Sequence, residues 1–61
     1  MSKIRTLREQ FGLTQNELAE KLNVKRSTLS MWELEKSTPS VKTLFKIAKV
    51  FGCTINDLVD Y

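Results

Sequence analysis

The sequence predicts an all-α fold of five short helices within 61 residues. Apolar residues recur at intervals of three and four, the spacing that places them on one face of a helix. Residues that cap helix N-termini precede four of these segments, namely Ser2, Thr14, Ser40 and Thr54. No segment shows the alternating pattern and turn of a β-hairpin. We therefore expect one compact domain over residues 1–61, built only from helices.

The first two helices are predicted from their ends as well as from their apolar faces. The first begins after Ser2 and stops at Gly12, because glycine adopts the left-handed conformation at little cost. Its apolar face consists of Ile4, Leu7 and Phe11. Thr14 and Glu17 have the spacing of a capping box, which marks the start of the second helix. The apolar face of that helix consists of Leu18, Ala19 and Leu22.

Residues 15–34 are predicted to form two helices joined by a tight turn. Asn23 ends the second helix, because asparagine enters the left-handed region more readily than most residues. The third helix is expected over residues 26–34, with Leu29 and Trp32 facing the core. Two short helices with this turn and a shared apolar interior form a helix-turn-helix motif.

Two further helices are predicted after residue 36. Pro39 disfavours helix at Thr38, and Ser40 caps the fourth helix, which Gly52 ends. The apolar face of this helix consists of Val41, Leu44, Ile47, Ala48 and Phe51. A second capping-box spacing predicts a fifth helix, with Thr54 and Asp57 at its start and Ile55, Leu58 and Val59 on its apolar side.

The side of the third helix that faces away from the core has an unusual composition. It carries Ser27, Ser30, Met31 and Leu34, with Arg26 and Thr28 at its edges. No carboxylate occurs between Glu20 and Glu33. Small hydroxyl side chains let a helix approach a surface closely, and arginine can reach a guanine edge or a phosphate. This composition indicates a nucleic-acid contact rather than an ordinary solvated face.

Composition argues against several classes of protein and site. Ten basic and seven acidic residues give a net charge of +3, which favours nucleic-acid binding only slightly. One cysteine, Cys53, and no histidine argue against a zinc site and indicate a reducing, cytoplasmic setting. The sequence has no apolar run long enough for a membrane span and no signal-peptide pattern. The sequence indicates no cofactor site and no small-molecule site. A chain this small depends for its stability on tight helix packing, on dimerisation, or on both.

With these elements placed, the chain resembles the DNA-binding domain of the lambda-type repressor and Cro family. The matching residues are Leu13-Thr14-Gln15-x-Glu17-Leu18-Ala19, Leu22-x-Val24, Ser27-Thr28-Leu29-Ser30, Trp32-Glu33, Pro39-Ser40, Leu44-x-x-Ile47-Ala48 and Asp57-Leu58. The resemblance implies a compact five-helix domain that binds operator DNA as a homodimer, with the third helix in the major groove. It also implies that Arg26, Ser27 and Met31 face base edges, that Gln15 holds the DNA backbone, and that Lys25, Thr28 and Ser30 lie at the groove rim.

The sequence departs from the family pattern at the ends of two helices. The family often has glycine at the end of the second helix, where this chain has Asn23 as an acceptable substitute. It usually has glycine or asparagine-glycine after the third helix, where this chain reads Leu34-Glu35-Lys36. Either Glu35 adopts a left-handed conformation or the third helix runs longer.

Several candidate contacts have a second interpretation. Arg26 could contact a guanine, a phosphate or only solvent, but a cation at a helix N-terminus opposes the helix dipole, which favours a functional role. Gln15 and the free amides near it suit a phosphate, or Gln15 is an ordinary surface residue. The same reasoning gives a second phosphate site at the start of the fourth helix, formed by Lys36, Ser37, Thr38, Ser40 and Lys42. The lysines, with Lys46 and Lys49, could instead form a solvated face.

Other residues are interpreted as structural. Arg8 and Glu33 lie at the edges of their apolar faces, so we predict a pair between the first and third helices that orients the third. Trp32 is expected in the core rather than stacked on a base, and Cys53 is read as a small buried hydrophobe. A small core cannot hold all of the remaining large apolar residues, which are Phe45, Val50, Val59 and Tyr61. They form either a patch against a second copy or scattered surface residues.

The predicted function is sequence-specific binding of double-stranded DNA. The chain would act as a small Cro-like repressor, an antitoxin-like autoregulator or an excised DNA-binding domain. The alternative is a protein-interaction module on the same fold, which the outward apolar residues Met31 and Leu34 favour. The sequence shows no nucleophile with a base, no paired carboxylates and no phosphate loop, so an enzyme is not predicted.

Overall fold

The computed structural model describes residues 2–59 and is all-α over that range. Four α-helices precede a single 3-10 turn: α1 (Lys3–Gln10), α2 (Gln15–Leu22), α3 (Arg26–Glu33), α4 (Val41–Phe51) and η1 (Ile55–Asp57). The all-α prediction is confirmed, but the predicted fifth helix is only the turn η1. One turn is enough to bring Leu58 into the core, where it is 6% exposed. Tyr61, assigned above to a surface patch, lies outside the described residues.

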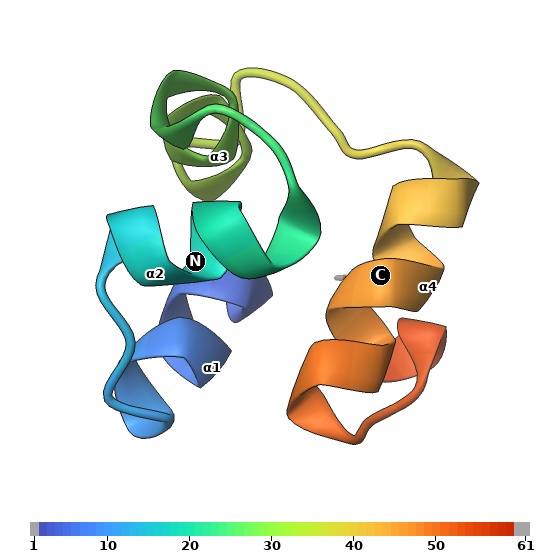
Figure 1. Cartoon of the computed structure of the whole chain (residues 1–61). Coiled ribbons are helices and arrows are strands. Elements are labelled where there is room, and N and C mark those ends of the chain that lie inside the picture. Colours follow the sequence, from blue (N-terminus) through green and yellow to red (C-terminus); the bar gives the residue numbers. More distant parts are fainter. Residues whose placement is uncertain (1, 60–61) are drawn as a thin grey trace.

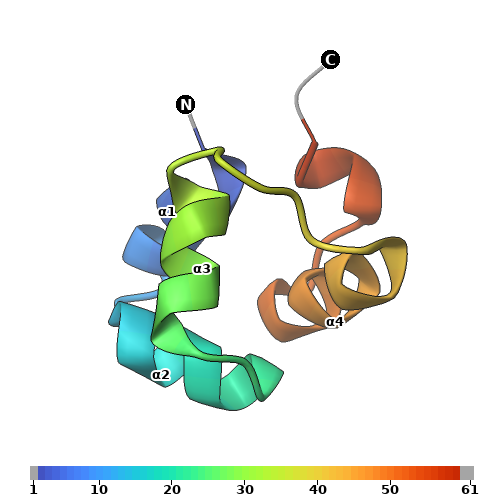
Figure 2. The same ribbon diagram turned by 90° about the horizontal axis from the view of Figure 1, so that it is seen from above.

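The helices are arranged around one shared interior (Figure 1). α2 and α3 lie together on one side of the molecule, α1 lies below them, and α4 forms the opposite side. The segment between α3 and α4 crosses from one side to the other. Seen from above, α3 lies along one face and no other helix covers it (Figure 2). Within the described chain, no other helix therefore packs over this face of the second helix of the motif.

The core forms where the inner faces of the helices meet. Leu18 of α2, Leu29 of α3 and Ile47 of α4 are fully buried at 0% exposure. Trp32 is 9% exposed, as expected for a core residue. Within the described part of the chain, Glu33 is the buried charged residue, at 8% exposure. A carboxylate in that position requires partners, because an isolated buried charge is costly.

Two residues assigned to apolar faces are mostly exposed. Phe11 is 54% exposed and Val41 is 65% exposed, so these two members of the predicted apolar faces are not buried. Both stand at helix ends, Phe11 as the C-cap of α1 and Val41 as the first residue of α4. The ends of a helix extend beyond the region where it contacts its neighbours. A terminal residue can therefore be exposed even though it lies on the apolar face of its helix. The Phe11 ring nonetheless contacts Phe51 edge to face, with centroids 5.0 Å apart.

Residues in the left-handed backbone conformation follow the helices at three predicted positions and at one further position, Glu35. Gly12, Asn23 and Gly52 have φ values of 69°, 56° and 65°. In each case the next residue donates its amide to the carbonyl oxygen five residues earlier. Glu35 has a φ of 61°, and Lys36 N donates to Met31 O at 2.9 Å in the same pattern. Of the two alternatives for Glu35, the left-handed one is observed, and α3 ends at Glu33 with Leu34 as its C-cap.

Candidate nucleic-acid interface

The two sides of α3 differ sharply in burial. Leu29 and Trp32 face the core, whereas Ser27 and Met31 on the opposite side and Arg26 at its edge are exposed. Thr28, at the other edge of this face, is half-buried, and so is Ser30, which was predicted to lie on the outward face itself. The three residues assigned to base edges are thus presented together, on a face that carries small side chains and no carboxylate.

The start of α3 is electropositive. Lys25 is the N-cap of this helix and makes no side-chain capping hydrogen bond, and the first turn contains no acidic residue. Arg26 is the first helical residue, and both cations are exposed. Helix N-termini carry a partial positive charge from their free amides, so two further cations here oppose the helix dipole. This end of α3 is suited to an anionic partner.

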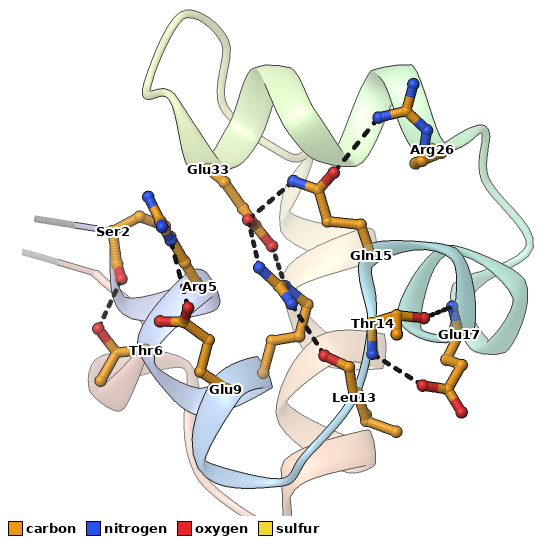
Figure 3. A network of polar contacts seen from close by, with 11 residues as sticks. Ser2, Arg5, Thr6, Glu9, Leu13, Thr14, Gln15, Glu17, Arg26 and Glu33 are labelled. Carbon is orange, nitrogen blue, oxygen red and sulfur yellow. Dashed lines mark hydrogen bonds and ion pairs between the residues drawn. The ribbon is translucent and has the colours of Figure 1, made fainter.

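A buried ion pair fastens α3 to α1. Arg8 donates from Nε to Glu33 Oε2 at 2.7 Å and from Nη2 to Glu33 Oε1 at 3.1 Å (Figure 3). The side chains are only 12% and 4% exposed, respectively. Arg8 Nη1 also donates to the carbonyl oxygen of Leu13 at 2.8 Å, which ties in the segment before α2. The hydrogen bond to Glu33 raises the pKa of Arg8.

Gln15 connects this ion pair to the outward face of α3. Its Nε2 donates to Glu33 Oε1 at 3.0 Å, and its Oε1 accepts from Arg26 Nη1 at 3.3 Å. The interactions run in sequence from Arg8 through Glu33 and Gln15 to Arg26 (Figure 3). Sequence reasoning missed this connection, because 18 residues separate Gln15 from Glu33 and no local pattern relates them.

The start of α2, which carries Gln15, is held by the predicted capping box. Glu17 N donates to Thr14 Oγ1 at 3.1 Å, and Thr14 N donates to Glu17 Oε1 at 2.8 Å. The backbone hydrogen bond from Thr14 lowers the pKa of the Glu17 carboxyl. Because both ends of this box are satisfied, the first turn of α2 has a fixed position from which Gln15 reaches towards α3.

The second group of candidate contacts lies around the start of α4. The exposed residues assigned there are Lys36, Ser37, Thr38, Ser40 and Lys42. The Ser40 hydroxyl is engaged in capping, accepting from Thr43 N at 3.2 Å and donating to Thr43 Oγ1 at 3.0 Å. Ser37 and Thr38 line a shallow groove between the start of α1 and the residues after η1. Residues 36–56 contain four lysines and no carboxylate, so this side of the molecule is also basic.

Comparison with known proteins identifies similar chains over almost the whole length. A helix-turn-helix family model matches residues 4–58. An uncharacterised helix-turn-helix-type transcriptional regulator of Methanocaldococcus jannaschii is 45% identical over 60 residues, which cover 98% of this chain and 91% of that protein. The transcriptional repressor RstR of the cryptic phage CTXphi from Vibrio cholerae is 38% identical over 58 residues, covering 95% of this chain and 52% of that protein.

A solved structure gives the same result for the fold. The crystal structure of a transcriptional regulator from Listeria innocua matches with a TM-score of 0.89 and 29% identity, covering 97% of this chain and 55% of that one. Among the described residues, no helix is long and apolar enough to cross a membrane. With the motif formed by α2 and α3, these matches show that the chain belongs to the lambda-repressor- and Cro-like helix-turn-helix family of transcriptional regulators, which implies DNA binding.

Proposed function

We propose that this chain binds specific sites in double-stranded DNA and regulates transcription, with α3 in the major groove. The observation that carries the proposal is the uncovered outward face of α3, with Ser27 and Met31 exposed on it and Arg26 exposed at its edge. A helix with its side chains is about 10–12 Å across, and the major groove is about 12 Å wide. Small hydroxyl residues on the outward face allow the close approach that this fit requires.

The contacts that hold α3 against the rest of the domain support the same proposal. Its inner side is fixed by the buried Leu29 and Trp32, and its last residue by the Arg8–Glu33 pair. A recognition element must be rigid, because the contacts that discriminate bases tolerate little displacement. In this arrangement Arg26 would contact a base edge, while Lys25 and residues around the start of α4 would contact phosphates.

We further propose that two copies act together on a palindromic site. Proteins with this motif read half-sites about 34 Å apart, one helical turn of DNA, and so need a partner copy. Phe45 and Val41 lie four residues apart on α4 and are 63% and 65% exposed. Among the described residues that were assigned above to a patch, Val50 and Val59 pack partly against the core, which leaves Phe45 for an intermolecular contact. The exposed side of α4 is therefore the surface we assign to the second copy.

Selection of binding sites from a random pool of duplex DNA tests the proposal. We expect an enriched, palindromic sequence whose affinity falls by about a hundredfold between 50 and 200 mM salt, the loss for roughly four neutralised phosphates. Arg26→Ala should relax the preference at one position in each half-site, at a cost of about 1–3 kcal/mol of discrimination. Lys21→Ala, which removes one exposed cation from the last turn of α2, is the matched control and should leave base preference intact.

One observation favours a second candidate function, a protein-interaction module. Met31 and Leu34 are 41% and 60% exposed on the outward side of α3, and exposed apolar residues suit contacts with proteins. The same experiment separates the two functions. Absence of any enriched sequence, with no retention of duplex DNA at low salt, would support the interaction module and contradict DNA recognition.

A further inference from the structure

We infer that Met31 reads the C5-methyl group of a pyrimidine in the major groove, which in unmodified DNA is a thymine. This inference rests on the proposed function and adds to it the chemical group that the middle of α3 recognises. It extends to cytosine methylated at C5, because that base presents the same methyl group at the same place on its edge. Methylation of a cytosine at this position would then strengthen binding.

Met31 lies on the part of α3 that points away from the core. The buried side of this helix is formed by Leu29 and Trp32. At 3.6 residues per turn, Ser27 and Met31 point away from that side, whereas Arg26 lies at the edge of the outward face. The middle of the outward face enters furthest when the helix lies in a groove. Met31 therefore faces base edges rather than phosphates.

The chemistry of its side chain restricts what Met31 can contact there. Base edges in the major groove carry hydrogen-bond donors and acceptors, whereas a thioether donates no hydrogen bond and accepts only weakly. An apolar side chain that covers polar groups removes their water without replacing its hydrogen bonds, which is unfavourable. Contact with a C5-methyl group avoids this cost, because that group is apolar. Methionine is also unbranched and flexible, so it adapts to the surface that it meets.

The Met31 side chain is available for such a contact. It is 41% exposed, and it belongs neither to the core nor to the partly buried residues packed against the core. No other helix of the described chain covers this face (Figure 2). Leu34, a second exposed apolar residue of α3, is the C-cap of the helix and lines a shallow groove with Arg5 and Thr6 of α1. Met31 is therefore the better placed of the two for contact with a base.

Met31 and Arg26 would read different base pairs. Met31 follows Arg26 by five residues, which corresponds to about 7.5 Å along a helix axis. Neighbouring base pairs are about 3.4 Å apart, so a helix that lies along the groove places these side chains roughly two base pairs apart. Loss of the methyl contact should leave the preference contributed by Arg26 intact, and the two contributions can be measured separately.

The test first removes the methyl group from the DNA. Each thymine of the site selected from the random pool is replaced in turn by deoxyuridine, which lacks only the C5-methyl group. We expect one thymine in each half-site at which this replacement lowers the affinity of wild type about fourfold, the value of one buried methyl group. In Met31→Ala, whose side chain is too short to reach the methyl group, the same replacement should have no effect.

A second pair of sites tests the same contact with methylated DNA. The thymine identified with deoxyuridine is changed to cytosine in one site and to 5-methylcytosine in the other, with guanine opposite in both. Because these sites differ only in the methyl group, wild type should bind the methylated site about fourfold more tightly. Met31→Ala should bind both sites equally. Met31→Leu, which keeps an apolar side chain of similar volume, should retain the preference.

Leu34→Ala is the matched control, because it also removes an exposed apolar side chain from α3. Met31 and Leu34 both lie outside the core, so neither variant should lose its fold, and circular dichroism checks this. Leu34→Ala should keep the wild-type ratio of affinities for the thymine and deoxyuridine sites. A ratio that is lost in Leu34→Ala and kept in Met31→Ala would assign the methyl contact to Leu34 and overturn the inference.

The outcomes separate this inference from the proposed function. Equal affinity of wild type for thymine and deoxyuridine at every position would overturn the inference, while selection of a sequence would still support DNA recognition. A methyl preference that persists in Met31→Ala would likewise contradict the role of Met31. An absence of any selected sequence for wild type would overturn the proposed function, and the inference with it.

Discussion

Glu33 is a polar residue whose replacement we expect to cost considerable stability. It is the buried charged group of the described chain, and it accepts hydrogen bonds from two helices other than its own. Its pair with Arg8 adds little net stability by itself, because removing both charges from water is expensive. Removing one partner is a different change, since the other charge is then left buried and uncompensated.

We predict that Glu33→Gln lowers the free energy of unfolding by up to about 3–5 kcal/mol. Urea denaturation followed by tryptophan fluorescence measures this directly, because Trp32 precedes Glu33 and lies in the core. Glu9→Gln is the control, since its pair with Arg5 spans 3.7 Å between side chains that are 57% and 60% exposed. An exposed pair of this kind contributes about 1 kcal/mol or less. Equal effects of the two substitutions would contradict the burial of Glu33.

The carboxylate in the capping box makes stability depend on acid. Hydrogen bonds from Thr14 lower the pKa of Glu17 below its ordinary value of 4.5 in the folded chain. A group with a lowered folded pKa stabilises the fold above its unfolded pKa, and this contribution is lost as the pH falls through the folded pKa. Wild type should therefore lose stability below pH 4.5.

We predict that Glu17→Gln loses less stability than wild type on acidification, because the amide that replaces the carboxylate has no proton to bind. The measurement is the urea midpoint of each protein at about pH 6 and at about pH 3. An identical loss in the two proteins would show that the acid sensitivity resides elsewhere in the chain.

At the scale of the elements, the end of α3 carries backbone strain. Glu35 has a φ of 61°, a conformation that costs a residue with a Cβ atom about 1–2 kcal/mol. The turn after α3 thus uses a left-handed residue of an unfavourable type, whereas Gly12 and Gly52 meet the same need without strain.

We predict that Glu35→Gly raises the free energy of unfolding by roughly 0.5–1 kcal/mol, after the greater freedom of glycine in the unfolded chain is subtracted. Asn23→Gly should give a smaller gain, because asparagine tolerates the same conformation better. Thermal denaturation of the three proteins ranks them. A loss of stability in Glu35→Gly would show that contacts of the Glu35 side chain outweigh the strain.

At the scale of the whole molecule, the exposed side of α4 determines whether two copies act together. Phe45 is 63% exposed, so its replacement should leave the fold of one copy intact. We predict that Phe45→Ser weakens self-association and lowers affinity for a site with two half-sites by tenfold or more, about 1.4 kcal/mol. Binding to a single half-site should not change. Sedimentation equilibrium and gel-shift titrations measure the two effects, and equal loss on both DNA sites would contradict the pairing surface.

Local signals in the sequence were enough to predict most of the fold. The caps at Thr14 and Ser40 and the left-handed residue Asn23 act within a few residues, so their patterns are readable without a structure. The fifth helix was overestimated because Thr54 and Asp57 hydrogen bond equally well across a single 3-10 turn. The side of each helix that faces the core was also predicted correctly. The sequence pattern does not tell how far a neighbouring helix extends, so it did not show that Phe11 and Val41 are exposed.

The candidate site was predictable in composition but not in its connections. The outward position of Ser27 and Met31, with Arg26 at the edge of that face, follows from helix geometry once Leu29 and Trp32 are assigned to the core. The link through Gln15 depends on the distance between two helix ends, which is set by tertiary packing. Periodicity in the sequence contains no information about that distance.

On heating, the contribution of the ion pair between α1 and α3 to stability should change differently from the contribution of the hydrophobic core. Ion hydration has a strongly negative entropy, so the desolvation penalty of a buried charge pair falls as temperature rises. The hydrophobic contribution per unit area levels off over the same range. The Arg8–Glu33 pair, with side chains 12% and 4% exposed, therefore gains relative importance on warming. In a chain with so small a core, it would become a growing share of what keeps α3 in place near the melting point.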